Sequence, residues 1–400
     1  MIEGFKGAVT YPKGFKAAGI RAGIKQSGED MALIVSDVPS CAAGVFTLNV
    51  VKAACVTINQ SRLPSDTIRA ILVNAGNANS YTGAQGHADA LETADRTAQL
   101  LGFSPEDVLI ASTGVIGHLL PMDKMRSGID LAAGSLSADG GEDAARAIMT
   151  TDTFPKEAAA EVIIGGKMVR IGGICKGAGM ICPNMATMLA FITTDAAIAP
   201  DLLQECLTRA VNKSFNCVTI DGDSSTNDMA LILANGAAGN PMLTADSPDL
   251  AVFQDALDAI GISLAKQIAR DGEGATKMIE ITVAGTGMSR DAAQIAKTIA
   301  NSPLFKTMMF GNDPNFGRVL AAAGRAGVVF DPSVVNLRFG EIVLVHAGEP
   351  VDFPQDEAHA LLKNPEVKVR LEVGTGPGES TVWTCDFSYD YVKINAEYHT

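Results

Sequence analysis

The sequence predicts an α/β fold. Short apolar runs, bounded by polar or glycine-containing segments, alternate along the chain with longer segments in which apolar residues recur at helical spacing. Of the 400 residues, 47% are hydrophobic and 19% are charged, so a sizeable core is available. A chain of this length exceeds what one core usually serves, and we expect two domains or one large double-layered domain.

The first half of the chain begins this alternation. Residues 31–35 and 70–73 are apolar runs of strand length, and residues 84–101 repeat apolar side chains every three or four positions, as a helix does. A strand from residue 108 then runs into the small-residue turn 112–117. Another apolar run at 188–194 predicts a strand just past the middle of the chain.

The second half of the chain continues the alternation of strand and helix patterns. Pro200 precedes a segment with helical spacing at 202–215, and residues 250–269 form a long amphipathic pattern, so both predict helices. Apolar runs and alternating patterns predict the remaining strands at 217–220, 229–233, 277–284 and 367–373. A further helix follows the turn 285–290 and ends near residue 300.

Three loops between these elements are candidates for binding. Residues 74–83 are rich in Asn and Gly and form either a long turn or an amide-lined pocket edge. The turn 112–117 exposes backbone amides that suit a carbonyl oxygen or an anion. Residues 149–156 place small polar groups before a proline, which suits either a solvated connection or a hydroxyl facing a substrate.

Composition and motifs exclude several classes of function. The net charge of −14 opposes non-specific binding to nucleic acid or anionic membranes, and neither a signal peptide nor a membrane-spanning run is apparent. Seven scattered cysteines without a CxxC pair favour reduced thiols in a cytoplasmic protein, and no paired histidines suggest a metal.

Two loops approach known ligand motifs without matching them. The loop from Asp221 resembles a calcium loop, but Thr226 and Ile232 stand where Gly and Glu are required, so we exclude calcium. The turn 285–290 lacks the third glycine of a dinucleotide fingerprint, because Arg290 takes its place.

Residues 172–195 hold the most informative segment. If the Thr187 hydroxyl lies near the Ala186 carbonyl, it can attack that carbon and shift the acyl group from nitrogen to oxygen. Hydrolysis of the ester would then cut the chain. The new N-terminal Thr187 would carry a hydroxyl nucleophile and an α-amine, whose ordinary pKa of about 7.7–8.0 suits a general base. Threonine at the start of a strand is also commonly structural, so the residues alone leave both interpretations open.

The segment KGAGMICPNMATML, from Lys176 to Leu189, resembles the signature of the ornithine acetyltransferase family, the glutamate N-acetyltransferases of arginine biosynthesis. The likeness extends along essentially the whole chain, through residues 73–79, 112–117, 149–153, 311–318 and 391–400. Several separate motifs in the right order make a chance similarity improbable.

The resemblance implies self-cleavage between Ala186 and Thr187 into an α chain, 1–186, and a β chain, 187–400, assembled as a heterotetramer of two α and two β chains. It implies transfer of the acetyl group of N2-acetyl-L-ornithine to L-glutamate through an acetyl-threonine intermediate, without a cofactor. Whether acetyl-coenzyme A is also a donor stays open. The implied fold has helix–sheet–sheet–helix layers like those of self-processing aminopeptidases, with a smaller C-terminal α/β domain from about residue 285.

The resemblance also assigns site residues. Thr113 and Gly114 would form the oxyanion hole. The residues that would line the substrate pocket are Thr150, Lys176, Thr187, Glu273, Asn395 and Thr400. Lys176 suits a substrate α-carboxylate and Glu273 an amino group. Thr151 is adjacent to Thr150, so which hydroxyl faces inward is open, and Cys182 is interpreted as packing.

Two other functions remain as alternatives. One is a self-cleaving N-terminal-threonine amidase or aminopeptidase of the same fold, in which water replaces glutamate as the acceptor. The other is a small-molecule binding or scaffold protein with an uncut chain.

Overall fold

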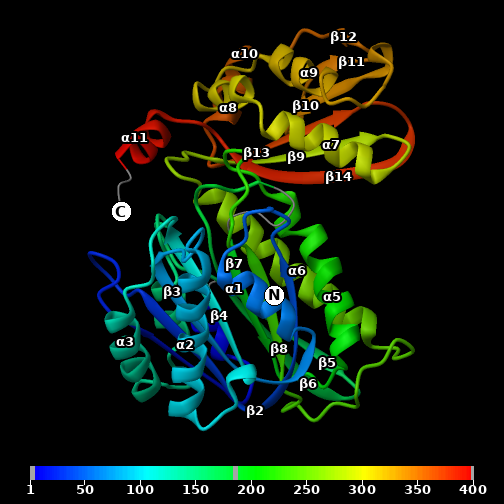
Figure 1. Cartoon of the computed structure of the whole chain (residues 1–400). Coiled ribbons are helices and arrows are strands. Elements are labelled where there is room, and N and C mark those ends of the chain that lie inside the picture. Colours follow the sequence, from blue (N-terminus) through cyan, green and yellow to red (C-terminus); the bar gives the residue numbers. More distant parts are fainter. Residues whose placement is uncertain (1–4, 183–187, 398–400) are drawn as a thin grey trace.

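The computed structural model describes residues 5–182 and 188–397. A large body is formed by the first two thirds of the chain, and a second sheet with its own helices lies above it in Figure 1. Among the described residues, we find no helix whose length and apolar character would let it cross a bilayer.

The large body is built on an eight-stranded sheet. Its strands are β1 (Phe15–Ile20), β2 (Met31–Phe46), β3 (Ser65–Asn77), β4 (Val108–Val115), β5 (Lys156–Ile164), β6 (Lys167–Lys176), β7 (Leu189–Thr194) and β8 (Met229–Ala234). The order is β4-β3-β2-β8-β7-β6-β5, with β1 also paired to β2. The β3–β4 and β7–β8 pairs are parallel, so each requires a crossover, which α2 (Gly83–Leu101) and α5 (Pro200–Lys213) provide.

The long strand β2 joins two halves of this sheet. Its first part pairs with β1 and β3, its last part pairs with β8, and its register shifts between Val35 and Ala42. Leu189 and Phe191 of β7 belong to a core shared with β1–β4, whereas Ala190 and Ile192 face α5 and α6 (Leu250–Arg270). The two halves of this sheet thus form two layers packed against each other, with helices outside them. This agrees with the expected helix–sheet–sheet–helix layering.

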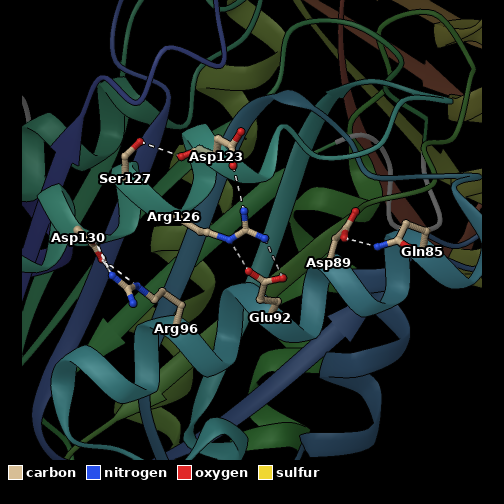
Figure 2. Close-up of polar contacts among 8 residues, drawn as sticks. All are labelled: Gln85, Asp89, Glu92, Arg96, Asp123, Arg126, Ser127 and Asp130. Carbon is tan, nitrogen blue, oxygen red and sulfur yellow. Dashed lines mark hydrogen bonds and ion pairs between the residues drawn. The ribbon is translucent and has the colours of Figure 1, made fainter.

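Helices α1 (Ala54–Arg62), α2, α3 (Met122–Gly134) and α4 (Gly141–Ala147) complete the N-terminal layer. Buried Ala90, Ala94 and Ala98 recur every four residues on α2, so small side chains let this helix pack closely. Figure 2 shows that α2 and α3 are also joined on their exposed sides, where Arg96 pairs with Asp130 at 2.7 Å and Glu92 pairs with Arg126 at 2.6 Å. Solvent screens such exposed pairs, so they add little to the stability of the fold.

The second sheet has six strands in the order β12-β11-β10-β13-β9-β14. Its elements are β9 (Met278–Gly285), α7 (Ser289–Ala300), α8 (Pro303–Phe310), α9 (Phe316–Gly324), β10 (Asn336–Phe339), β11 (Ile342–His346), β12 (Glu349–Pro350), α10 (Gln355–Leu362), β13 (Glu366–Glu372) and β14 (Gly376–Cys385). They enclose a separate apolar core, which includes Phe305 and Phe339. Helix α11 (Tyr389–Glu397) follows and brings the chain back toward the large body (Figure 1).

One predicted strand is wrong. Residues 217–220 do not form a strand, because Cys217 ends a 3-10 helix (Phe215–Cys217) and Val218 makes only an isolated bridge to Trp383. Thr219 N donates to the Trp383 carbonyl and Ile220 N donates to the Ile181 carbonyl. This apolar segment therefore links β14 of the second sheet to the β6–β7 connection through single hydrogen bonds instead of entering either sheet.

Candidate active site

A cavity of about 600 Å³, including its open mouth, lies where strand ends and loops of the large body meet α11. The cavity brings together six of the nine predicted site residues: Thr113, Gly114, Thr150, Lys176, Glu273 and Asn395. The other three, Ala186, Thr187 and Thr400, lie outside the described residues.

The proposed oxyanion turn lies at the end of β4, beside β3. Gly114 has φ 131°, and a Cβ there would lie 2.3 Å from the carbonyl carbon of Gly76. Only glycine fits this close approach of two strand ends. Thr113 is buried, and its Oγ1 accepts a hydrogen bond of 3.4 Å from Lys176 Nζ, so the turn contacts the end of β6.

Lys176 places a buried ammonium in the cavity wall. Its side chain extends from the last residue of β6 and is 3% exposed. Burial lowers the pKa of Lys176 from its ordinary value, and the carboxylates that oppose this shift belong to Asp152, Asp228 and Glu273. An ammonium held in this way is suited to a ligand carboxylate, because charge-assisted contacts are strong away from water.

Glu273 supplies the opposite charge from the loop after α6. Its backbone N donates to the Ala178 carbonyl at 2.8 Å, and Asn395 Nδ2 of α11 donates to Glu273 Oε2 at 2.8 Å. A Cβ at Gly179 would lie 2.3 Å from the Glu273 carboxylate carbon. Glycine at 179 therefore lets this carboxylate lie against the β6–β7 connection.

Thr150 and Thr151 both line the cavity. Thr150 N donates to Asp152 Oδ2 at 3.0 Å, which fixes the backbone of this loop. Both residues thus border the cavity, and the choice between their hydroxyls stays open.

Cys182 and Met188 are the described residues that flank 183–187. Burial raises the pKa of Cys182, so the thiolate is disfavoured and the interpretation of this residue as packing is supported. Met188 N donates to Asp228 Oδ1 at 3.0 Å. Asp228 Oδ2 is buried and has no hydrogen-bond partner among the described residues, and burial raises the Asp228 pKa well above its ordinary value.

Sequence reasoning missed Ser225 and Asn227, which also line the cavity. They belong to the loop that starts at Asp221, which sequence reasoning compared only with a calcium-binding loop. Asn227 Nδ2 donates to the carbonyls of Ala78 and Ser112 at 2.7 and 2.8 Å. These bonds connect the loop to the two other cavity segments, 74–83 and 112–117. Its run of small polar residues between apolar segments was the available signal.

Of the two interpretations of loop 74–83, the side-chain contacts favour the long turn over the amide-lined pocket edge. The Asn74 side chain donates to the Asn77 carbonyl, and the Asn79 side chain donates to the Gly86 carbonyl. These amides stabilise the turn itself, and Ala78 is the residue of this loop that lines the cavity. Across residues 5–182 and 188–397, no group of three or more His, Cys, Asp or Glu side chains is arranged to hold a metal ion.

Comparison with known proteins gives full-length matches. A family model described as the ArgJ family matches residues 16–400. An "Arginine biosynthesis bifunctional protein ArgJ" from Symbiobacterium thermophilum is 52% identical over 402 residues and spans 100% of both chains. A protein of the same name from Gloeobacter violaceus is 51% identical over 403 residues, covering 100% of this chain and 99% of its own.

A solved structure also matches. It is the crystal structure of the arginine biosynthesis bifunctional protein from Bacillus halodurans, with a TM-score of 0.51 and 44% identity. The match covers 98% of that solved chain but 52% of this one.

Proposed function

This chain belongs to the ArgJ family, and on that premise we propose that it transfers the acetyl group of N2-acetyl-L-ornithine to L-glutamate in arginine biosynthesis. Its full-length relatives are named as bifunctional proteins of arginine biosynthesis. The observation that carries the proposal is the pairing of a buried ammonium, Lys176, with a carboxylate, Glu273, in one small cavity. Amino acids with an α-carboxylate and an amine match these two charges.

The cavity residues divide the work of binding. Lys176 Nζ holds the substrate α-carboxylate, and Glu273 holds the free side-chain amine of acetylornithine. Asn395 fixes one Glu273 oxygen through its amide, leaving Oε1 for the ligand. N-Acetylornithine is thus bound through two groups that do not react, and its acetyl carbonyl is left facing the oxyanion turn at Thr113 and Gly114. Glutamate shares the contact of its α-carboxylate with Lys176, and its α-amine stays free to react.

Chemistry proceeds through Thr187. Its Oγ attacks the acetyl carbonyl while the Thr187 α-amine takes the hydroxyl proton, and amides of the turn at Thr113 and Gly114 stabilise the oxyanion. The C–N bond then breaks, the proton passes to the departing α-amine of ornithine, and acetyl-threonine remains. The α-amine of glutamate attacks this ester and restores the free Thr187 hydroxyl.

The α-amine exists only after cleavage, so the proposal includes self-cleavage between Ala186 and Thr187. Support comes from the Bacillus halodurans relative, whose solved chain is nearly all aligned yet spans only half of this chain. The products would be an α chain of residues 1–186 and a β chain of residues 187–400, assembled as two of each. Seven free cysteines suit a reducing cytoplasm.

Acetyl-coenzyme A is retained in the proposal as a second donor. Offering it and N-acetylornithine separately, each with glutamate, decides whether both donors give N-acetylglutamate. Formation of acetate with either donor, without N-acetylglutamate, would instead support the amidase alternative.

The proposal is tested by intact mass and product analysis of the wild type and of Thr187→Ala. Wild type should show two fragments meeting at Ala186–Thr187 and should form ornithine and N-acetylglutamate in equal amounts. Thr187→Ala should stay full length and inactive, whereas Thr208→Ala, at an exposed position on α5, should behave as wild type. A single full-length wild-type species without acetyl transfer would overturn the proposal.

A further inference from the structure

We propose that Asp152 and Lys156 are positioning residues, which together with Asp271 hold the two charged side chains of the cavity, Lys176 and Glu273, in place. None of these three residues lines the cavity within the described part of the chain. The inference rests on the proposed function, because it deepens the substrate-binding roles of Lys176 and Glu273.

Lys156 is the centre of this network. It is the first residue of β5 and is fully buried. Its Nζ donates to Asp152 Oδ1 at 2.6 Å and to Asp271 Oδ2 at 2.5 Å. Asp271 directly follows α6 and stands two residues before Glu273. One ammonium therefore joins the loop that carries Thr150 to the loop that carries Glu273.

Asp152 fixes the backbone on the Lys176 side. Its Oδ1 accepts a hydrogen bond of 2.7 Å from Gly177 N, and its Oδ2 accepts one of 3.0 Å from Thr150 N. Each contact lies beside, or at, a residue that lines the cavity. A shift of this carboxylate would thus displace the end of β6 and the Thr150 loop together.

Asp271 fixes the Glu273 side. It accepts hydrogen bonds from the backbone N of Thr153, at 3.0 Å, and from the Thr153 hydroxyl. The backbone between Asp271 and Glu273 is held at both ends, because Asp271 N donates to the Gln267 carbonyl at 3.1 Å and Glu273 N donates to the Ala178 carbonyl at 2.8 Å. A shift of Asp271 would therefore also move Glu273, which is two residues further along the chain.

The energetics favour a positioning role over a purely stabilising one. Burying an ammonium and two carboxylates carries a large desolvation cost, and apolar replacements of such groups are often equally stable. The network instead fixes the relative positions of the segments around it, because each of its carboxylates accepts two or more hydrogen bonds from different segments.

The network also bears on the charge of Lys176. The charged groups around Lys176 are Asp152, Lys156, Asp228, Glu273 and, from another loop, Lys25. Burial would raise the pKa of Asp152, but the ammonium groups of Lys156 and Lys176 hold it below its ordinary value. Removing this carboxylate leaves those ammonium groups facing each other with one negative charge fewer. The pKa of Lys176 then falls further, and the lysine loses its proton at lower pH.

The test compares Asp152→Asn with a matched control, Asp195→Asn. Asp195 is also buried and also accepts hydrogen bonds from two backbone amides, those of Lys13 and Arg170, but it lies near the opposite end of the β6–β7 pair. KM and kcat for glutamate and N-acetylornithine are measured across neutral and alkaline pH. We expect Asp152→Asn to raise KM by about tenfold or more, with a smaller change in kcat, because a charge-assisted contact is weakened. The alkaline rise in KM should begin at lower pH than in wild type.

A second measurement removes any dependence on chain cleavage. Glutamate binding is measured by calorimetry in the uncut Thr187→Ala background, with and without Asp152→Asn. The same loss of affinity and the same pH displacement are expected there. Lys156→Arg should retain more affinity than Lys156→Met, because the guanidinium can still bridge two carboxylates.

The outcomes separate the two proposals. A wild type that binds glutamate but transfers no acetyl group contradicts the proposed function. The positioning role is then tested by the calorimetric comparison alone, because that comparison measures binding and not acetyl transfer. If Asp152→Asn binds glutamate as tightly as its parent at every pH, or if Asp195→Asn loses affinity equally, the positioning role is overturned.

Discussion

Replacement of Gly179 by alanine should impair substrate binding while leaving the fold largely intact. The added Cβ would lie 2.3 Å from the Glu273 carboxylate carbon and 2.4 Å from Oε2. Position 179 has no left-handed φ, and the clash is with the end of a flexible side chain, so Glu273 can rotate away. The folded state then loses the hydrogen bond from Asn395. Because Asn395 is exposed and water can replace either partner, this bond contributes no more than an ordinary one, about 0.5–1.5 kcal/mol.

The expected loss in binding is larger than the loss in stability. A charge-assisted contact from Glu273 to a substrate amine contributes about 1.5–3 kcal/mol, which corresponds to roughly a 10- to 150-fold rise in KM. Steady-state kinetics with N-acetylornithine measures this rise, and urea unfolding measures stability. Gly134→Ala is the control, because a Cβ there meets open space. An unchanged KM in Gly179→Ala, despite normal folding, would refute the role given to Glu273.

Three further predictions concern the same cavity. Gly114→Ala should lower kcat by about 10²–10³-fold, because its Cβ would meet the Gly76 backbone and displace the oxyanion turn, and it should also destabilise the fold; kinetics and thermal unfolding measure both. Cys182→Ser should keep near wild-type kcat, since the pKa of this thiol is raised; a loss above tenfold would restore a catalytic role. The folded-state pKa of Asp152 is depressed, so its stabilising contribution is present above the unfolded pKa of about 3.9 and is lost as pH falls through the folded value. Urea unfolding over that acidic range should therefore show a weaker pH dependence for Asp152→Asn than for wild type.

Local patterns sufficed for the elements with strong periodicity. The helices α2 and α6 and the strands β7 and β8 lie within a residue or two of their predicted bounds. The topology was not accessible in this way, because the division of β2 between two sets of partners depends on tertiary contacts. The strand predicted at 217–220 failed for the same reason, since an apolar run does not say which sheet, if any, will pair with it.

The candidate site shows a similar division. Motif resemblance supplied residues that the structure places around one cavity, although their roles stay predictions. Ser225 and Asn227 were missed because their loop had been judged only by the spacing of a calcium motif. The contact between Lys156 and Asp271 joins residues 115 positions apart, and neither residue belongs to a recognisable pattern with the other. Long-range ion pairs of this kind become visible only when the fold is known.

The role of Thr187 is tested most directly by trapping the acyl-enzyme. Protein mixed with N-acetylornithine in the absence of glutamate is quenched and digested, and the acetylated peptide is identified by mass spectrometry. We predict one acetyl group on the fragment that begins at Thr187, with release of an equal amount of ornithine, and loss of that acetyl group when glutamate is added. Release of ornithine without any acetyl group at Thr187, or with the acetyl group on another residue, would contradict the proposed mechanism.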